Sequence, residues 1–214
     1  MNRPPIDTGA ELRDVIVEPL GEFAVLVRNL MDPWRYTVAL PAVTELVPAR
    51  SDLGVYLDPA APAVSSLQIL KSLSRRAEGL SDSASIEIPV LYDGEDLPEL
   101  EDRICQSVVS LHQTGEYTVQ FIGFMPGFPY MTGLPDGLRG LPRRSTPRTR
   151  VPAGAVAIAE DTCGIYPAES PGGWWLLGRT PLKICDPRSD FFLFKPGDRV
   201  RFRAISPAEF EEFQ

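Results

Sequence analysis

The stretch "YTVQFIGFMPGFPYMTGLP", from Tyr117 to Pro135, governs how the second half of this chain is organised. Its first six residues are rich in β-branched and aromatic side chains, which predicts a strand. Residues 123–135 mix prolines and glycines with large apolar side chains. Such a segment is too stiff for a helix and too interrupted for a strand, so we expect a long loop. Long loops in compact domains are usually functional or disordered, and this one is too aromatic for disorder. It is therefore either a rigid plug over a barrel end or a preorganised wall of a binding site.

The residues that follow this loop predict a β-barrel. Short β-type runs alternate with turns rich in proline and glycine, at 155–159, 173–179, 182–186, 191–194 and 198–205. Many short strands with such turns are typical of a closed or nearly closed barrel. In the last run, Arg199, Arg201 and Arg203 alternate with Val200 and Phe202, so one face of that strand is expected to meet water.

A single amphipathic helix is predicted just before the opening stretch, over residues 93–117. Its apolar residues recur at three- and four-residue steps, and they are Leu97, Leu100, Ile104, Val108 and Leu111. Asp93 or Asp96 could cap its start and Gly115 its end. The acidic group Asp93, Glu95 and Asp96 is most simply explained as helix capping, and we place a domain boundary near Asp93.

The first 92 residues alternate between strand and helix patterns. The runs 14–20 and 23–30 predict a hairpin around Gly21, and residues 52–59 and 84–92 predict two more strands. Helices are expected over 34–48, apart from Pro41, and over 62–76. We therefore expect an α+β protein, with a small ferredoxin-like α/β domain at 1–92 and a β-barrel domain at 93–214.

Composition excludes several classes of function. The 214 residues carry a net charge of −8, which disfavours general binding to nucleic acid or to an anionic membrane. No apolar run is long enough to span a bilayer, and the N-terminus lacks a secretory signal, so a cytoplasmic location is expected. The three cysteines and the single histidine, His112, lack the spacing of a metal site or of a disulfide framework. We expect no metal bound by this chain, and we expect His112 to be structural, close to the carbonyls that end its helix.

A basic segment stands out in this acidic chain. Within "RGLPRRSTPRTR" lie Arg139, Arg143, Arg144, Arg148 and Arg150. Guanidinium groups bind phosphate or carboxylate through two parallel hydrogen bonds, so an anion site is one interpretation. A solvated loop with surface ion pairs is the other.

The third motif is "GIYPAESPGGWWLLGRTP", residues 164–181. Ser170 could be a nucleophile or a hydrogen-bond donor, but a catalytic triad is disfavoured because His112 lies on a distant helix. Gly172 and Gly173 could present backbone N–H groups to an anion, or could simply form a tight turn before a buried strand. Cys163 has no recognisable activating base nearby in the sequence, which argues against a thiolate nucleophile.

Taken in order, these motifs resemble the family that includes the B subunit of 5-oxoprolinase, allophanate hydrolase subunit 1 and the kinase inhibitor KipI. The resemblance runs from about Ile88 to Phe202 and includes "IPVLYDGEDL", "LHQTGEYTV", "GFMPGFPYMTGLP", "PRRSTPRTRVPAGAVAIA", "GIYPAESPGGWWLLGRTPL" and "PGDRVRF". It implies a small α/β N-terminal domain followed by a cyclophilin-like β-barrel. Family members typically read Gln-Thr-Gly before "IYP", whereas this chain has Thr162 and Cys163 before Gly164. Because an unmet hydrogen bond discriminates strongly, substrate choice can differ here.

The resemblance also implies a function. It suggests one component of a hetero-oligomeric, ATP-dependent amidohydrolase that opens 5-oxoproline to glutamate, with ATP and magnesium at a site shared with its partners. The implied partners are the C subunit of that enzyme, similar to allophanate hydrolase subunit 2, and its LamB/YcsF-like A subunit. The alternatives are an allophanate hydrolase or urea carboxylase-related subunit and a histidine-kinase inhibitor of the KipI type.

Candidate site residues follow from matching the motifs to these roles. The candidate catalytic residues are Arg143, Arg148, Tyr166 and Ser170. The candidate substrate- or nucleotide-binding residues are Phe124, Pro126, Gly127, Phe128, Tyr130, Arg144, Pro152, Gly172, Gly173, Trp174, Arg179 and Thr180. We expect Tyr166, Ser170 and Arg179 to face the same site as the opening loop.

Overall fold

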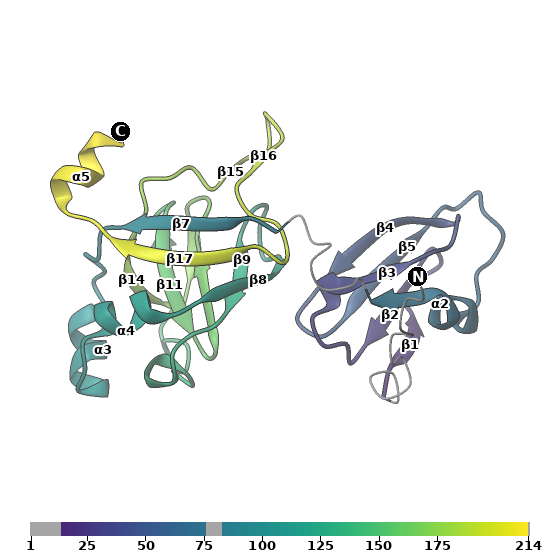
Figure 1. Ribbon diagram of the computed structural model, residues 1–214, viewed down its shortest axis with the longest axis horizontal. Helices are drawn as coiled ribbons and strands as arrows, with labels where there is room; N and C mark the ends of the chain where they lie inside the picture. Colours follow the sequence, from purple (N-terminus) through teal and green to yellow (C-terminus); the bar gives the residue numbers. More distant parts are fainter. Residues whose placement is uncertain (1–13, 76–82, 214) are drawn as a thin grey trace, which may run out of the picture. The chain divides into compact units, whose positions relative to one another are not determined.

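The computed structural model describes residues 14–75 and 83–213, and the chain divides into two compact units, Met1–Asp82 and Ser83–Gln214 (Figure 1). The extreme N-terminus, where no secretory signal is expected, lies outside the described residues. No helix in the described part of the chain is long and apolar enough to cross a membrane.

The first unit contains a four-stranded antiparallel sheet in the order β1-β2-β5-β4. The predicted hairpin is confirmed as β1 (Ile16–Pro19) and β2 (Ala24–Arg28), and Gly21 in the connecting turn has a φ of 86°. The predicted strand at 52–59 is β5 (Leu53–Leu57). Val27 and Val55 are fully buried because β2 and β5 are the central strands of this sheet.

The helix predicted over residues 34–48 was wrong. This segment forms a short 3-10 helix, η1 (Pro33–Arg35), and the strands β3 (Tyr36–Val38) and β4 (Val43–Pro48). Its valines and threonines favour extended backbone, and Pro41 cannot donate the hydrogen bond that a continuous helix needs.

The second predicted helix of this unit is confirmed but short. Helix α2 (Ser66–Ser72) begins at a capping box formed by Ser65 and Gln68, and it buries Ile69. The chain then turns into β6 (Leu73–Arg75), which pairs with β3. Among the described residues of this unit α2 is the one α-helix, so the expected two-helix ferredoxin-like arrangement is not confirmed.

The second unit begins about ten residues before the expected boundary. Strand β7 (Ser85–Val90) pairs in parallel with β17 (Arg199–Ala204), near the other end of the sequence. Residues 83–92 therefore belong with the barrel and not with the first unit.

The barrel expected from the strand pattern is present as a seven-stranded, nearly closed sheet in the order β14-β11-β12-β9-β8-β17-β7 (Figure 1). The other strands are β8 (Tyr117–Ile122), β9 (Pro129–Thr132), β11 (Ala155–Ala159), β12 (Thr162–Ile165) and β14 (Trp175–Arg179). Leu91 and Arg179 exchange backbone hydrogen bonds at 2.9 Å, and this bridge joins the two edge strands β7 and β14. Closure in this way leaves little unpaired strand edge.

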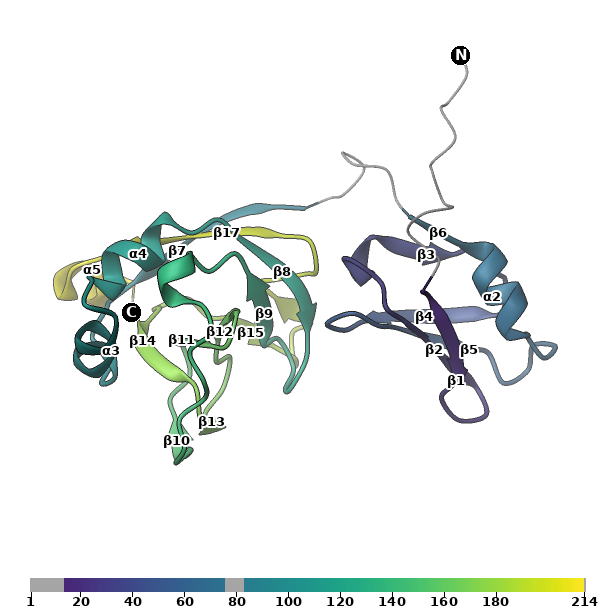
Figure 2. The ribbon, with the colours of Figure 1, turned by 90° about the horizontal axis from the view of Figure 1, so that it is seen from below.

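Two shorter ribbons and a C-terminal helix complete the unit. Strands β10 (Arg148–Val151) and β13 (Ser170–Gly172) pair and extend away from the barrel (Figure 2). Strands β15 (Cys185–Asp186) and β16 (Phe191–Phe192) form a small hairpin, and η2 (Asp136–Leu138) and α5 (Pro207–Glu212) are single short turns of helix. On β17, Val200 and Phe202 are buried while Arg199, Arg201 and Arg203 are exposed, as predicted.

The helix predicted over 93–117 is broken into α3 (Leu97–Ile104) and α4 (Val108–Thr114). Cys105 lies between them with a φ of 54°, in the left-handed region that ends a helix. Helix α4 ends at Gly115, as expected. The opening loop is also shorter than predicted, because residues 129–132 form β9 between β8 and β12.

Candidate functional site

The opening loop, the end of β12 and the residue before β14 together form an aromatic cluster. Its members are Phe124, Phe128, Tyr130, Tyr166 and Trp174. The ring centroid of Phe128 lies 5.1 Å from that of Tyr166 and 5.5 Å from that of Trp174, and in both pairs the ring planes are nearly perpendicular. Tyr130 lies 5.7 Å from Trp174, and Phe124 lies 6.4 Å from Tyr166. Such edge-to-face contacts hold rings in defined orientations.

Glycines in the three motifs make this close packing possible. A Cβ on Gly164 would meet the ring of Phe128 at 2.7 Å, and one on Gly172 would meet the hydroxyl oxygen of Tyr166 at 2.3 Å. Gly127, with a φ of 80°, packs against the side chain of Cys185, whose thiol donates to the carbonyl of Pro126. Glycine at these positions therefore serves close approach between the loop and its neighbours.

The cluster is apolar in its body but ends in polar groups. Tyr166 and Trp174 are only 2% and 6% exposed. Within the described residues, the two tyrosine hydroxyls and the indole Nε1 of Trp174 form no hydrogen bond, and none of them is among the fully buried polar atoms that lack a partner, so each reaches solvent. The neighbouring Trp175, by contrast, donates its Nε1–H to the carbonyl of Pro142 at 2.7 Å. These polar tips are therefore available to a ligand or to water.

The tyrosine hydroxyls are neutral donors near pH 7. Burial raises the pKa of Tyr166 to about 12, with a further contribution from Tyr130 that the charges of Arg143 and Arg148 partly offset. Burial likewise raises the pKa of Tyr130, and Arg143 opposes the shift. The positive charge of Arg143 thus acts on both hydroxyls.

Two of the predicted anion-binding arginines are held by an internal carboxylate. Oδ1 of Asp96 accepts from Nη1 of Arg144 at 2.7 Å and from Nη2 of Arg148 at 2.6 Å, and Oδ2 accepts from the backbone N–H of Leu176 at 2.7 Å. Asp96 is 2% exposed. Burial opposes the charge of Arg148, but the hydrogen bonds and charges of Asp96 and Glu95 outweigh it and raise the pKa of that guanidinium.

This arrangement corrects the expected role of Asp96. Asp96 occupies the N-cap position of α3 but makes no side-chain capping bond there. It instead ties the start of α3 to β10 and β14. The sequence showed an acidic run and a basic segment, but their pairing across about fifty residues cannot be read from spacing alone.

Arg143, unlike Arg144 and Arg148, does not contact Asp96. Its Nε lies 3.5 Å from Oε1 of Glu160, and the two side chains are 60% and 48% exposed. Arg150, also exposed, pairs with Glu169 at 2.5 Å. All five arginines of the basic segment therefore form ion pairs, and the pair of Arg143 with Glu160 is the longest of them.

The remaining predicted site residues fall into two groups. Ser170 and Gly172 lie on β13 beside the cluster, Ser170 donating its hydroxyl to the carbonyl of Pro171 at 3.2 Å. The carbonyl of Gly173 accepts from the backbone N–H of Arg144 at 2.8 Å. Neither glycine has a positive φ, so the nest-like turn expected as one alternative is not formed. Pro152 lies in the turn between β10 and β11, where its carbonyl accepts from Ala155.

Arg179 and Thr180 lie at the end of β14 opposite to Trp174, and the side chain of Arg179 contacts residues outside the aromatic cluster. Arg179 ends β14, pairs with Asp93 at 2.9 Å and stacks on the ring of Phe210. Trp174 precedes the opposite end of the same strand. Thr180 is buried in the turn after β14, where its hydroxyl accepts from Leu182. Both residues are level with Tyr166 in the sheet, because Ala155 pairs with Arg179 and accepts from the backbone N–H of Tyr166, while Gly154 donates to the carbonyl of Tyr166 and accepts from Thr180.

A buried hydrogen-bonded chain links three residues that the sequence did not connect. His112 Nδ1 lies 2.7 Å from the hydroxyl of Tyr92, and its Nε2 lies 3.4 Å from Sγ of Cys163. A base therefore does adjoin Cys163, but both side chains are fully buried. Burial lowers the pKa of His112 to about 3 and raises the pKa of the Cys163 thiol, so a neutral, structural group is what the arrangement supports.

The two residues that depart from the family pattern point to opposite sides of β12. Cys163 belongs to the barrel core, whereas Gly164 and Tyr166 contact the aromatic cluster. Because side chains alternate along a strand, Thr162 shares the face of Gly164. Thr162, and not Cys163, is the departure that can alter the site.

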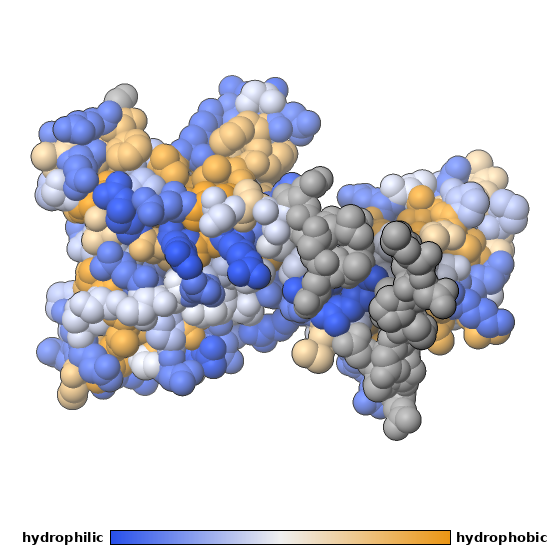
Figure 3. All heavy atoms as spheres, in the orientation of Figure 1, coloured by the Kyte–Doolittle hydropathy of each residue, from blue (hydrophilic) through white to orange (hydrophobic). Residues whose placement is uncertain are grey.

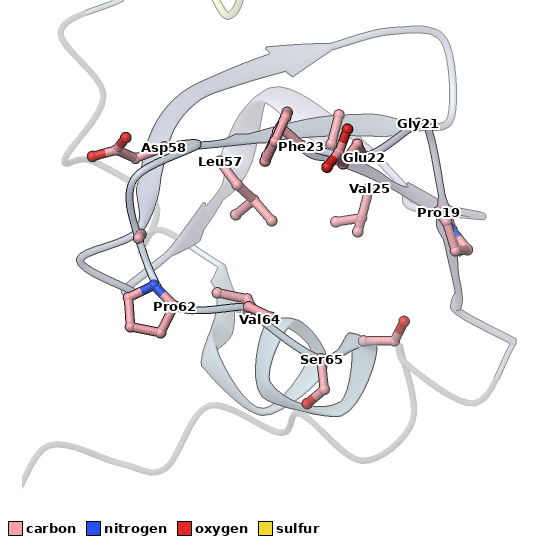
Figure 4. A pocket seen from close by; sticks show the side chains of 14 residues that line it. Pro19, Gly21, Glu22, Phe23, Val25, Leu57, Asp58, Pro62, Val64 and Ser65 are labelled. Atoms are coloured by element: carbon pink, nitrogen blue, oxygen red, sulfur yellow. The ribbon is translucent and has the colours of Figure 1, made fainter.

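A separate pocket of about 420 Å³ lies within the first unit (Figure 4). Val25, Leu57 and Val64 supply apolar walls, while Glu22 and Asp58 carry carboxylates at its rim. None of the predicted site residues lines it.

The barrel unit also exposes aromatic side chains near the site. Phe191 and Phe192 on β16 are 41% and 44% exposed, and Phe124 is 62% exposed. Apolar residues are visible around the β15–β16 hairpin in Figure 3. Phe192 also approaches Gly127 of the opening loop, so this apolar surface adjoins the aromatic cluster.

Comparison with known proteins defines the class. The family described as carboxyltransferase domain, subdomain C and D, matches residues 25–194. The chain belongs to this family.

Curated relatives cover most of the chain, and each is named as the B subunit of 5-oxoprolinase. The chain is 41% identical to the protein of Escherichia coli O157:H7, over 79% of this chain and 83% of that protein. It is 38% identical to the protein of Haemophilus influenzae, over 87% and 96%. The corresponding protein of Bacillus subtilis is 34% identical, over 81% and 80%.

Solved structures support the same fold. The crystal structure of TTHA0988 has a TM-score of 0.69 and 43% identity over 78% of this chain, which spans about a third (34%) of that structure's length. The urea carboxylase of Kluyveromyces lactis, at 17% identity, has a TM-score of 0.63 over 92% of this chain and 22% of that protein. At that identity the likeness concerns the fold alone.

Proposed function

We propose that this chain is the B subunit of a 5-oxoprolinase, an enzyme that opens 5-oxoproline to glutamate with hydrolysis of ATP. The observation that carries the proposal is identity of 34–41%, over most of both chains, to proteins named as that subunit. The aromatic cluster with its unpaired polar tips supplies a surface on which a small substrate can bind.

The chemistry of a lactam sets what such a site must do. The amide carbon of 5-oxoproline is a weak electrophile, and transfer of a phosphoryl group from ATP to the lactam oxygen would activate it. Such a transfer requires positive charge and hydrogen-bond donors aimed at the developing negative charge. Arg143, Tyr130 and Tyr166 are donors of this kind beside an apolar wall.

The other predicted catalytic residues have supporting roles in this proposal. Arg148 and Arg144 hold β10 and the loop before it through Asp96, which keeps Arg143 and Trp174 in place. Ser170 lies on the strand paired with β10, where its hydroxyl can serve as a donor. These groups do not form a base–nucleophile pair with one another, so in this proposal they bind and orient and do not attack.

The residues of this chain fit only part of an ATP and magnesium site. The sequence has no Walker A motif, and the described residues contain no group of three or more His, Cys, Asp or Glu side chains that could hold a metal ion. We therefore assign most contacts with ATP and magnesium to partner subunits of the C and A types. The exposed aromatic side chains of Phe124, Phe191 and Phe192 suit contact with such a partner.

The test is reconstitution. The chain is co-purified with its cognate C and A subunits, and ATP turnover is measured on 5-oxoproline, urea and allophanate. We expect ATP hydrolysis coupled to glutamate formation with 5-oxoproline alone. Turnover on urea or allophanate would favour the urea-related alternative, and a chain that stays monomeric with its partners by light scattering would contradict membership of such a complex.

A further inference from the structure

The backbone of Phe124 is held in a conformation that its side chain disfavours. Its φ is 66°, in the left-handed region, which a bulky residue rarely adopts. The backbone N–H of Met125 donates to the carbonyl of Gly123 at 2.7 Å, so Phe124 has the hydrogen bond and the positive φ of a classic γ-turn, which is rare and strained. Glycine would adopt this conformation without strain. The turn itself therefore favours glycine at position 124.

The rest of the loop holds this strained turn in place. The backbone N–H of Gly123 donates to the carbonyl of Phe128 at 3.2 Å, and the N–H of Phe128 donates to the carbonyl of Met125 at 3.1 Å. The thiol of Cys185 donates to the carbonyl of Pro126 at 3.2 Å, which ties the loop to the β15–β16 hairpin. Strained residues persist only where their surroundings hold them, and they cluster at binding sites and switches.

The side chain that the turn presents is largely exposed. Phe124 is 62% exposed, and its ring meets those of Phe128 and Tyr166 nearly perpendicularly, at centroid distances of 5.5 and 6.4 Å. Burial within this chain therefore does not explain a phenylalanine at a position that favours glycine. A second ring, that of Phe192, is 44% exposed and would lie 3.7 Å from a Cβ on Gly127, in the same loop.

We propose that Phe124, with Phe192 beside its loop, is the anchor through which this chain binds a partner subunit that presents an apolar, concave surface. This role takes the place of the substrate contact expected from the motif. The inference rests on the proposed function, in which the chain works in a hetero-oligomeric complex, and it deepens that function by naming the surface that meets the partner.

Three observations favour a different subunit as the occupant. Aromatic side chains are enriched at protein interfaces and supply much of their binding energy. A turn already closed in the free chain presents its ring without further loss of entropy on binding. A small ligand is normally enclosed by its site, whereas the ring of Phe124 is mostly free. A second copy of this chain would bring together two net charges of −8, which repel.

The test compares the affinity of full-length variants for the cognate C subunit, measured by calorimetry without ATP or 5-oxoproline. Phe124→Gly and Phe124→Ala both lack the ring, so each is expected to bind about ten-fold or more weakly than the wild type. Wild-type affinity in either variant, or no binding by the wild type, would overturn the proposal.

The same two variants measure the strain. Glycine relieves a left-handed backbone and alanine does not, so free Phe124→Gly is expected to have a Tm about 2–4 °C above that of Phe124→Ala. Equal Tm values would show that Phe124 is not held against its preference, and would remove the basis of the proposal.

A matched control separates strain from contact. Cys105 is also exposed and left-handed, with a φ of 54°. Cys105→Gly should exceed Cys105→Ala in Tm by a similar amount, but it should keep the wild-type affinity for the C subunit. A ten-fold loss of affinity in Cys105→Gly would show that relief of strain, and not loss of the Phe124 ring, weakens binding.

Kinetics distinguish a protein partner from other occupants. With saturating partner subunits, Phe124→Gly is expected to regain the wild-type KM for 5-oxoproline, because the ring meets a subunit and not the substrate. A raised KM with unchanged partner affinity would assign Phe124 to the substrate. Dimerisation of the isolated chain that Phe124→Gly abolishes would assign it to a second copy. Either result would overturn the proposal.

The outcomes separate this proposal from the proposed function. If the complex opens 5-oxoproline with ATP but Phe124→Gly keeps its affinity for the partner, the surface is wrong and the function stands. If Phe124→Gly weakens partner binding but the wild-type complex does not hydrolyse ATP with 5-oxoproline, the function is wrong and the surface stands.

Discussion

The carboxylate of Asp96 accepts a hydrogen bond from Nη2 of Arg148 at 2.6 Å, and the same oxygen accepts from Arg144. The buried Asp96, together with Glu95 and Glu99, therefore balances the charges of two of the arginines that the sequence marks as anion-binding candidates. Arg144 and Arg148 are thus held by a buried carboxylate, whereas Arg143 is 60% exposed and pairs with Glu160.

We predict that Asp96→Asn destabilises the protein by about 3 kcal/mol, since it leaves two partly buried guanidinium groups without their shared charge. The measurement is urea-induced unfolding at pH 7. Glu99→Gln is the matched control, because Glu99 meets only Arg144 and is 58% exposed. That variant should lose less than about 1 kcal/mol, and equal losses in the two variants would show that Asp96 is not the organising group.

Tyr130→Phe is predicted to lower turnover in the reconstituted complex about ten-fold while leaving thermal stability nearly unchanged. The hydroxyl of Tyr130 has no partner in the described part of the chain, so its removal orphans no protein group, and the ring contacts with Phe121 and Trp174 remain. Steady-state kinetics and calorimetric Tm measure the two effects. Unchanged turnover would show that the loop at residues 123–135 is only a rigid plug of the barrel.

Acid is predicted to destabilise the barrel through His112. Its pKa is about 3 in the folded state and 6.5 as an ordinary histidine, so between these values the unfolded chain binds a proton that the folded chain does not. Stability is therefore full above pH 6.5 and falls as pH falls, by up to about 1.4 kcal/mol per pH unit. Unfolding measured from about pH 7.5 to about pH 5.5 should show this slope, above the range in which most carboxylates titrate.

The variant His112→Gln tests whether His112 is the source of this dependence of stability on pH. It should be less stable than the wild type at neutral pH, because it disturbs a fully buried side chain, but it should lose the dependence on pH. A wild-type slope in this variant would exclude His112 as its source.

The three cysteines are predicted to react with an aromatic disulfide reagent in order of exposure. Cys105 is exposed, Cys185 is partly buried and hydrogen-bonded to Pro126, and Cys163 is buried beside His112. Burial raises the pKa of Cys163, which further lowers its reactivity. We expect two thiols to react in the native protein and the third only on unfolding. The variants Cys105→Ser and Cys185→Ser show which thiol gives which reaction. Rapid reaction of all three thiols would contradict the buried position of Cys163.

Local patterns in the sequence predicted much of the secondary structure. The hairpin around Gly21, the strand at 53–57 and the barrel strands β7, β8, β11, β14 and β17 were recognised, because alternation and turn residues act over a few neighbours. The barrel strands β9 and β12 were not predicted. The helix predicted at 34–48 failed because β-branched residues and sheet pairing outweighed a weak apolar period. The helix across Cys105 failed because a left-handed residue can end a helix without a glycine or proline to mark it.

Sequence patterns were enough to predict the α+β class, the barrel, and the three motifs that supply Phe128, Arg143 and Tyr166. The folded chain was needed to show that Asp96 holds Arg144 and Arg148, and that the side chain of Arg179 pairs with Asp93 and stacks on Phe210. These roles depend on contacts between residues as distant in sequence as Asp96 and Arg148. The energy of a buried ion pair or an unpaired hydroxyl depends on its surroundings in space, and no local spacing encodes them.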